Sequence, residues 1–194
     1  MKKILLFLAC SIISMPLFAQ YQEAIFGAKF GANMTNIQAE NGSPVVTRLS
    51  IGITTEYKIN TFIAFGAELN YGGIGYATYE TVGTSQGSPV TDLVTYNYNT
   101  LSLPLLVKVY LFEKISLEGG IQVGAVLYAK RNERGDKEKL DRSEYNSLEF
   151  GIPVGIAYNA KSGVVLGTRV LFPKTTIYND DKDLTVSAYI GYKF

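Results

Sequence analysis

The sequence predicts an all-β fold: an eight-stranded antiparallel up-and-down β-barrel that crosses a membrane. Three observations predict it. Apolar residues alternate with polar residues and glycines along eight segments, and a period of two is that of a strand with two different faces. The connections between these segments are alternately short and long, as in outer-membrane barrels. The last segment ends on Phe194, whose ring can lie at a lipid–water interface.

Residues 1–19 precede the first strand and have the three-part layout of a secretory signal peptide. Two lysines follow Met1, an apolar run extends over 4–18, and Ala19 offers a cleavage point. We therefore expect a signal peptide over 1–19 and one barrel domain over 20–194. Lipoprotein processing before Cys10 is the alternative, which is disfavoured because the apolar run continues past this cysteine.

The first four strands are expected at 24–34, 47–57, 62–72 and 99–110. Their apolar faces are, in chain order, Ala-Phe-Ala-Phe-Ala-Met, Leu-Ile-Ile-Thr-Tyr, Ile-Phe-Ala-Leu-Tyr and Leu-Leu-Leu-Val-Val. Aliphatic and aromatic residues at every second position are typical of a half-buried strand.

The last four strands are expected at 116–128, 147–158, 163–172 and 183–194. The apolar faces are Leu-Gly-Ile-Val-Ala-Leu from 117, Leu-Phe-Ile-Val-Ile-Tyr from 148, Val-Leu-Thr-Val-Phe from 164 and Leu-Val-Ala-Ile-Tyr-Phe from 184. The 163–172 segment differs in that Val165 and Leu171 place apolar residues on its second face as well.

The connections alternate in length. The links at 58–61, 112–115 and 159–162 are short, whereas 35–46, 73–98, 129–146 and 173–182 are longer. Short periplasmic turns and long extracellular loops are the layout of an outer-membrane barrel. We therefore expect both ends of the barrel domain on the periplasmic side and the long loops on the cell surface.

The second face of the strands carries charges and glycines. Its charged residues are Lys29, Arg48, Glu56, Glu68, Lys108, Glu118, Glu149, Arg169 and Lys193. Glycines weaken a strand that faces water, but they make room for long side chains inside a narrow eight-stranded barrel. Five basic and four acidic residues nearly balance, so we expect an ion-paired interior without a continuous pore. A soluble lipocalin-like barrel would reverse the two faces.

Composition excludes several kinds of chemistry. The chain has no histidine, and its only cysteine lies in the expected signal peptide. A Ser-His-Asp set or a His/Cys zinc site is therefore excluded from the mature chain. Beyond residue 19 the chain has 16 basic and 17 acidic residues, a net charge of −1, which gives no reason to expect nucleic-acid binding. We predict no enzyme, no cofactor and no metal.

Three motifs carry a family resemblance: Phe26-Gly-Ala-Lys-Phe-Gly-Ala-Asn-Met-Thr-Asn36, Leu69-Asn-Tyr-Gly-Gly-Ile-Gly75 and Leu101-Ser-Leu-Pro-Leu-Leu-Val-Lys108. In order and spacing they resemble the PorT-like outer-membrane barrels of Bacteroidetes, although Arg169-Val170 stands where that family has Arg-Tyr. The resemblance implies an eight-stranded barrel of the OmpX and OmpA kind in a Gram-negative outer membrane. Some members take part in secretion, gliding or adhesion.

The C-terminal residues Ile190, Tyr192 and Phe194 resemble the insertion signal of bacterial outer-membrane barrels. The resemblance implies that the barrel assembly machinery is a partner during insertion. Outer-membrane lipid and lipopolysaccharide are the surrounding partners we expect, and a protein partner could bind the extracellular loops.

The sequence therefore predicts a non-enzymatic integral outer-membrane protein, a structural or interaction and adhesion scaffold that displays long loops. A narrow small-solute channel or a secretion-associated barrel is one alternative. A soluble periplasmic ligand-binding barrel is the other.

Overall fold

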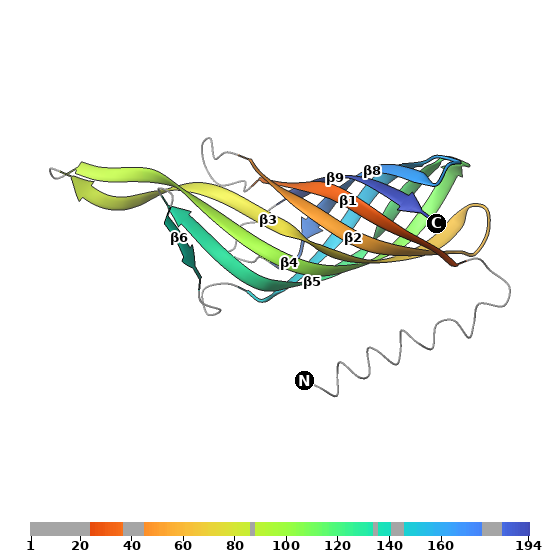
Figure 1. The fold of residues 1–194 in the computed structure, drawn as a ribbon, viewed down its shortest axis with the longest axis horizontal. Coiled ribbons are helices and arrows are strands. Elements are labelled where there is room, and N and C mark those ends of the chain that lie inside the picture. Colours follow the sequence, from red (N-terminus) through yellow and green to blue (C-terminus); the bar gives the residue numbers. More distant parts are fainter. Residues whose placement is uncertain (1–23, 37–44, 86–87, 134–135, 141–145, 176–183) are drawn as a thin grey trace, which may run out of the picture.

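Antiparallel strands make up almost all of the part of the chain that the computed structural model describes, residues 24–36, 45–85, 88–133, 136–140, 146–175 and 184–194 (Figure 1). The expected signal peptide lies outside these residues. The strands are β1 (Ala24–Asn36), β2 (Val46–Lys58), β3 (Ile63–Ser85), β4 (Ser88–Phe112), β5 (Ile115–Glu133), β6 (Asp136–Lys139), β7 (Leu148–Asn159), β8 (Val164–Pro173) and β9 (Leu184–Lys193). Within the described ranges, no helix is long and apolar enough to span a membrane.

Eight of these strands close into a ring. Neighbours follow the order β4-β3-β2-β1-β9-β8-β7-β5, and pairing between β4 and β5 completes the circle. Strands β1 and β9 lie side by side, so the first and last barrel strands are hydrogen-bonded to each other. The predicted eight-stranded up-and-down barrel is confirmed.

The register around the ring fixes the shape of the barrel. Consecutive paired residues lead from Ala24 through Tyr57, Phe65, Val107, Gly119, Val154, Val170 and Val186 to Met34. The path returns to β1 ten residues from its start (34 − 24), which is the shear of the barrel. Eight strands with this shear tilt by about 40° and enclose a backbone radius of about 8 Å. Such a lumen is narrow enough for side chains to fill it.

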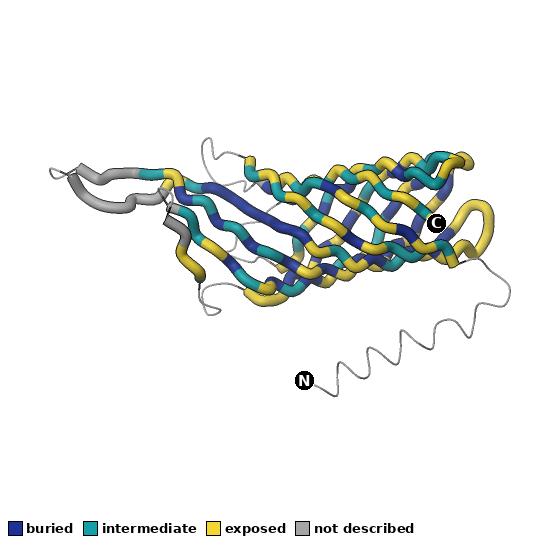
Figure 2. The backbone as a smooth tube through the Cα atoms, in the orientation of Figure 1, coloured by how far each residue is buried: buried dark blue, intermediate teal, exposed yellow. Residues whose placement is uncertain are grey.

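The two faces of the barrel differ as the alternation predicts. Burial alternates along the barrel strands (Figure 2), and large apolar side chains such as Leu49, Ile53 and Phe65 are exposed on the outer wall. Inward-facing charged residues such as Glu68 and Arg169 are buried. This arrangement is the reverse of that in a lipocalin-like barrel.

The expected loop at 73–98 is wrong. Strands β3 and β4 continue past the barrel rim and pair as a hairpin up to Ser85 and Ser88 (Figure 1). The expected loop at 129–146 is wrong in part, because β5 extends to Glu133 and then pairs with β6.

These extensions form a projecting sheet, β3-β4-β5-β6, above the barrel. The reason is local packing: Tyr76, Val94, Tyr96, Tyr98, Val126 and Ala129 form a buried cluster of their own. The rings of Tyr76 and Tyr96 stack with their centroids 4.9 Å apart. A segment with its own apolar core can stay a strand where it has left the barrel wall.

At the opposite end, compact turns join the strands. The Asn60 side-chain carbonyl accepts hydrogen bonds from the backbone N–H groups of Phe62 and Ile63, at 2.8 and 2.7 Å. Gly163 has a φ of +90° in the turn between β7 and β8, a conformation that favours glycine. The barrel therefore has one short, tightly turned end and one elaborated end.

Candidate functional site

The lumen contains a chain of charged side chains that alternate in sign. Its members are, in order of contact, Lys29, Glu68, Arg169, Glu118, Lys108, Glu56 and Lys193. Each of the three carboxylates contacts two cations, and the chain begins and ends on a lysine. Because a buried charge without a partner is strongly unfavourable, this alternation allows seven ionic groups to lie inside one narrow barrel. We call this set the lumen chain.

Arg169 is at the centre of the lumen chain. It projects from β8 toward β3, which is four places away in the eight-membered ring. Its Nη1 and Nη2 atoms donate to the two carboxylate oxygens of Glu68 at 2.8 and 3.0 Å, and Nη2 also donates to Glu118 at 2.5 Å. The planar guanidinium matches this two-pronged contact, which a lysine could not make. Arg169 therefore ties opposite walls of the barrel together.

The other half of the lumen chain runs toward the short turns. The Lys108 ammonium lies 3.2 Å from both Glu56 and Glu118. The Lys193 ammonium lies 2.9 Å from Glu56 and donates to the Asn159 side-chain carbonyl at 2.8 Å. With Asn159 from β7, every barrel strand supplies at least one residue to this network. The network thus crosslinks the whole ring.

Two tyrosines complete the network, and the sequence analysis missed both. The Tyr110 hydroxyl donates to Glu56 at 2.5 Å, and the Tyr189 hydroxyl donates to Glu118 at 3.0 Å. The Tyr189 ring centroid also lies 4.9 Å from the Lys29 ammonium. Both tyrosines share the parity of the charged residues on their strands, and that signal could have identified them.

Of the charged residues assigned to the interior, Arg48 and Glu149 do not belong to the lumen chain. Both lie toward the elaborated end. Glu149 is buried beside Gly124, its register partner on β5. Arg48 is half-buried and packs against Gly73. Parity assigns them to the same face as the lumen chain, but it gives no information on their height in the barrel.

A small polar cavity of about 60 Å³ lies beside the lumen chain. Its lining includes Asn33, Ser50, Asn70, Ser102 and Gln122. At about 30 Å³ for each water molecule, it could hold roughly two. Among the described residues there is no group of three or more His, Cys, Asp or Glu side chains that could hold a metal ion.

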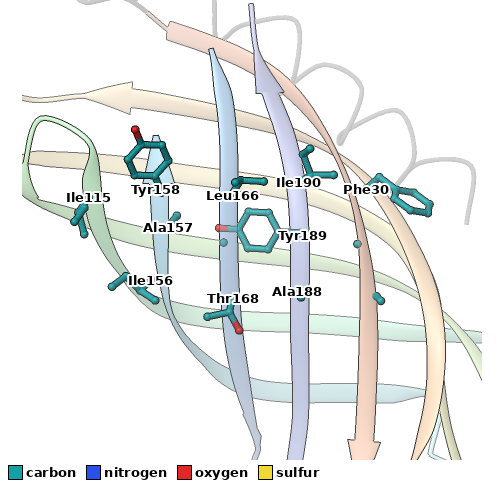
Figure 3. A pocket seen from close by; sticks show the side chains of 13 residues that line it. Phe30, Ile115, Ile156, Ala157, Tyr158, Leu166, Thr168, Ala188, Tyr189 and Ile190 are labelled. Carbon is teal, nitrogen blue, oxygen red and sulfur yellow. The ribbon is translucent and has the colours of Figure 1, made fainter. Parts of the chain in front are cut away.

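The outer wall has a shallow recess of about 660 Å³ over β1, β9, β8 and β7 (Figure 3). Small side chains form a row across it, because Ala188 is paired with Ala32 on one side and with Thr168 on the other. Larger residues such as Phe30 and Ile190 border it. The recess is mainly apolar, and the polar side chains that line it, such as Thr168 and Tyr158, carry hydroxyl groups, so it presents mainly packing surface.

Comparison with known proteins agrees with this geometry. Residues 18–178 match the model of the family described as "Outer membrane protein beta-barrel domain". The chain belongs to this family. The barrel is therefore an integral outer-membrane protein, whose exposed apolar wall contacts lipid and whose long hairpins lie on the extracellular side.

A solved outer-membrane barrel shares the fold. The attachment invasion locus protein Ail of Yersinia pestis is 14% identical, with a TM-score of 0.52 over 89% of this chain and 99% of that one. A structure of Ail with the heparin analogue sucrose octasulfate is 12% identical, with the same TM-score and coverage. Neisserial surface protein A is 14% identical, with a TM-score of 0.49 over 88% and 97% of the two chains. No curated protein matches this outer-membrane barrel.

Proposed function

We propose that this outer-membrane barrel is a non-enzymatic interaction scaffold, which presents its projecting sheet to a macromolecular partner outside the cell. The projecting sheet itself is the observation that carries the proposal. Strands β3 and β4 pair for many residues beyond the point where β2 leaves β3, at the Ser50–Gly72 pair. A barrel that only spanned the membrane would not need this extension.

The projecting sheet has the properties of a binding platform. Its buried tyrosine cluster holds the strands in place before any partner arrives, and such preorganisation lowers the entropy lost on binding. Tyr79 and Leu93 are directly paired across β3 and β4, and both are exposed. A tyrosine beside an aliphatic residue supplies large contact area at low entropic cost.

The fold-level comparison is consistent with attachment. Ail is called an attachment invasion locus protein and has been crystallised with a heparin analogue. Its low sequence identity supports the fold alone, so the partner of the present barrel has to be found by experiment.

Site-specific photo-cross-linking in intact cells tests the proposal. A photoreactive amino acid replaces Tyr79 on the projecting sheet or, as a matched control, Leu103 on the lipid-facing wall. We expect a discrete protein or glycan adduct from position 79 alone, which Leu93→Asp abolishes while the barrel stays folded. Absence of an adduct at position 79, or an equal adduct at position 103, would contradict the proposal.

The lumen argues against the channel alternative. The contact between Arg169 and Glu68 spans the barrel, and the lumen chain occupies its interior. Within our proposal these ion pairs stabilise the barrel and block its lumen to solutes. A steady single-channel conductance of the purified barrel in planar bilayers would overturn this assignment.

Three finer assignments belong to the same proposal. The first is that residues 1–19 are a signal peptide and residues 20–194 the barrel domain. The second is that the barrel belongs to a PorT-like subgroup, which is supported by the order of the motifs at Phe26–Asn36, Leu69–Gly75 and Leu101–Lys108. N-terminal sequencing of the mature protein tests the boundary, since a start at Gln20 is expected.

The third assignment concerns the last strand. Ile190, Tyr192 and Phe194 all point outward and are exposed, and the backbone N–H of Phe194 donates to the Phe26 carbonyl at 2.8 Å. Strand β9 is fully paired with β1 and still ends on aromatic side chains that face outward. This arrangement supports the proposal that these three residues are the signal that the assembly machinery binds.

A further inference from the structure

The β5–β6 hairpin places two lysines directly opposite each other. Lys130 is paired with Lys139 across the hairpin, and both are exposed. Like charges at directly opposed positions destabilise a sheet. The next pair, Arg131 and Glu138, has the opposite charges that a hairpin ordinarily uses. The lysine pair is therefore unfavourable for the isolated hairpin and would gain from a bound anion.

The two ammonium groups have no acidic partner within the described part of the chain. Among the described residues, neither lysine takes part in an ion pair. The Lys130 ammonium lies 5.5 Å from the centroid of the Tyr128 ring, and this ring supports the lysine without neutralising its charge. As far as the described residues go, the hydrogen-bond donors of both ammonium groups are therefore available for an oxyanion.

The height of the lysine pair along the barrel indicates which oxyanions lie within its reach. The apolar wall of β5 ends at Leu127, which is exposed. Tyr128 follows on β5 and is half-buried. Tyrosines mark the membrane–water interface. Lys130 lies two residues farther along the strand, about 7 Å from Tyr128, at the level of the lipid headgroups.

The pair also points to the lipid side of the projecting sheet. Ala129, between Tyr128 and Lys130, is fully buried in the tyrosine cluster on the inner face. A register shift opposite Asn99 and Thr100 leaves Leu127 as an extra residue of β5, so Tyr128 follows it on the outer face. Side chains alternate again from there, and Lys130 also faces outward, over the surrounding leaflet. We propose that Lys130 and Lys139 form a binding site for the phosphate groups of an anionic glycolipid of the outer leaflet, the lipid A headgroup of lipopolysaccharide.

Native mass spectrometry of the detergent-solubilised barrel, titrated with lipid A, tests this site. The test variant is Lys130→Gln with Lys139→Gln. The matched control is Lys114→Gln with Lys161→Gln, which removes the same charge from exposed turn residues at the periplasmic end. Basic residues near an anionic lipid surface each contribute about fivefold in affinity, so we expect the test variant to bind lipid A about thirtyfold more weakly. The control should bind like the wild type. Dephosphorylated lipid A should bind the wild type as weakly as lipid A binds the test variant.

Several results would overturn the proposal: equal binding of lipid A by the test variant and the wild type, an equal loss in the control, or no effect of removing the phosphates. The proposal would also be overturned if the test variant lost its binding to heparin but still bound lipid A as tightly as the wild type does. All variants alter exposed side chains, and a folded band on an unheated gel confirms that each barrel is intact. Photo-cross-linking at position 79 is independent of this result, since it reports on the tip of the projecting sheet.

Discussion

Replacing Arg169 with methionine would show how much the lumen chain contributes to stability. Arg169 is only 6% exposed and donates three hydrogen bonds to the carboxylates of Glu68 and Glu118. Methionine is also long and flexible but carries no charge. In Arg169→Met, Glu68 keeps only Lys29 and Glu118 keeps only Lys108 among their cations.

The size of the effect follows from burial. Removing one partner from a buried ion pair costs about 3–5 kcal/mol, which lowers the folding equilibrium constant by about two to four orders of magnitude. Lys193→Met should cost less, about 1–3 kcal/mol, because Lys193 ends the lumen chain and contacts one carboxylate. Lys161→Met should leave stability unchanged, since its pair with Glu113 is long, at 3.8 Å, and exposed.

Urea titration of the barrel in lipid vesicles measures these differences. Folded and unfolded fractions are separated by their mobility on unheated gels. Equal midpoints for Arg169→Met and wild type, or a larger loss in Lys193→Met, would refute the reasoning. A second variant checks the cause: adding Glu68→Gln to Arg169→Met should recover part of the loss, because it removes the carboxylate that has lost its strongest partner.

Three further outcomes are expected. Gly167→Ala should destabilise the barrel, because a Cβ there would lie 2.3 Å from the ring of Tyr189, whereas Gly119→Ala, with 4.0 Å to its nearest neighbour, should be tolerated in the same titration. A cysteine at Leu103 should resist a water-soluble maleimide in intact membranes; rapid labelling would show that this wall does not contact lipid. Truncation of Phe194 should lower the yield of assembled barrel in cells but not refolding into detergent, and an equal loss in both would assign the residue to stability instead.

The alternation of residues was enough to predict the barrel wall. A period of two depends only on side chains within one strand, so β1, β2, β7, β8 and β9 were found within a few residues of their observed bounds. Strands β3, β4 and β5 were found as well, but each extends beyond its predicted end on the extracellular side. The same parity placed Glu68, Lys108 and Arg169 inside. Inward-facing Leu106 and Leu171 are buried too, so the inner face is less uniformly polar than the charges alone suggested.

The projecting sheet could not be predicted in the same way. Gly72 and Gly73 interrupt the pattern of β3 at the rim, and the following residues are rich in Thr, Ser and Tyr. Such a composition suits a loop as well as a strand. What decides the outcome is non-local, because Tyr76 on β3 stacks on Tyr96 of β4, and both belong to a cluster that includes Ala129 of β5.

Which charges meet inside the barrel depends on the register accumulated around the ring. Lys108 and Glu118 face each other across one tight turn, so this contact is nearly local. Arg169 and Glu68 are 101 residues apart and meet only because the eight registers sum to a shear of ten. A slip of two residues at any interface keeps every side chain on its proper face, but it displaces one wall by about 7 Å along the strand. That displacement is longer than any ion-pair distance in the lumen chain, so the slip would break these ion pairs. The apolar wall would tolerate the slip, because its side chains would still face lipid. We infer that the ionic groups select the register that the hydrophobic pattern leaves open.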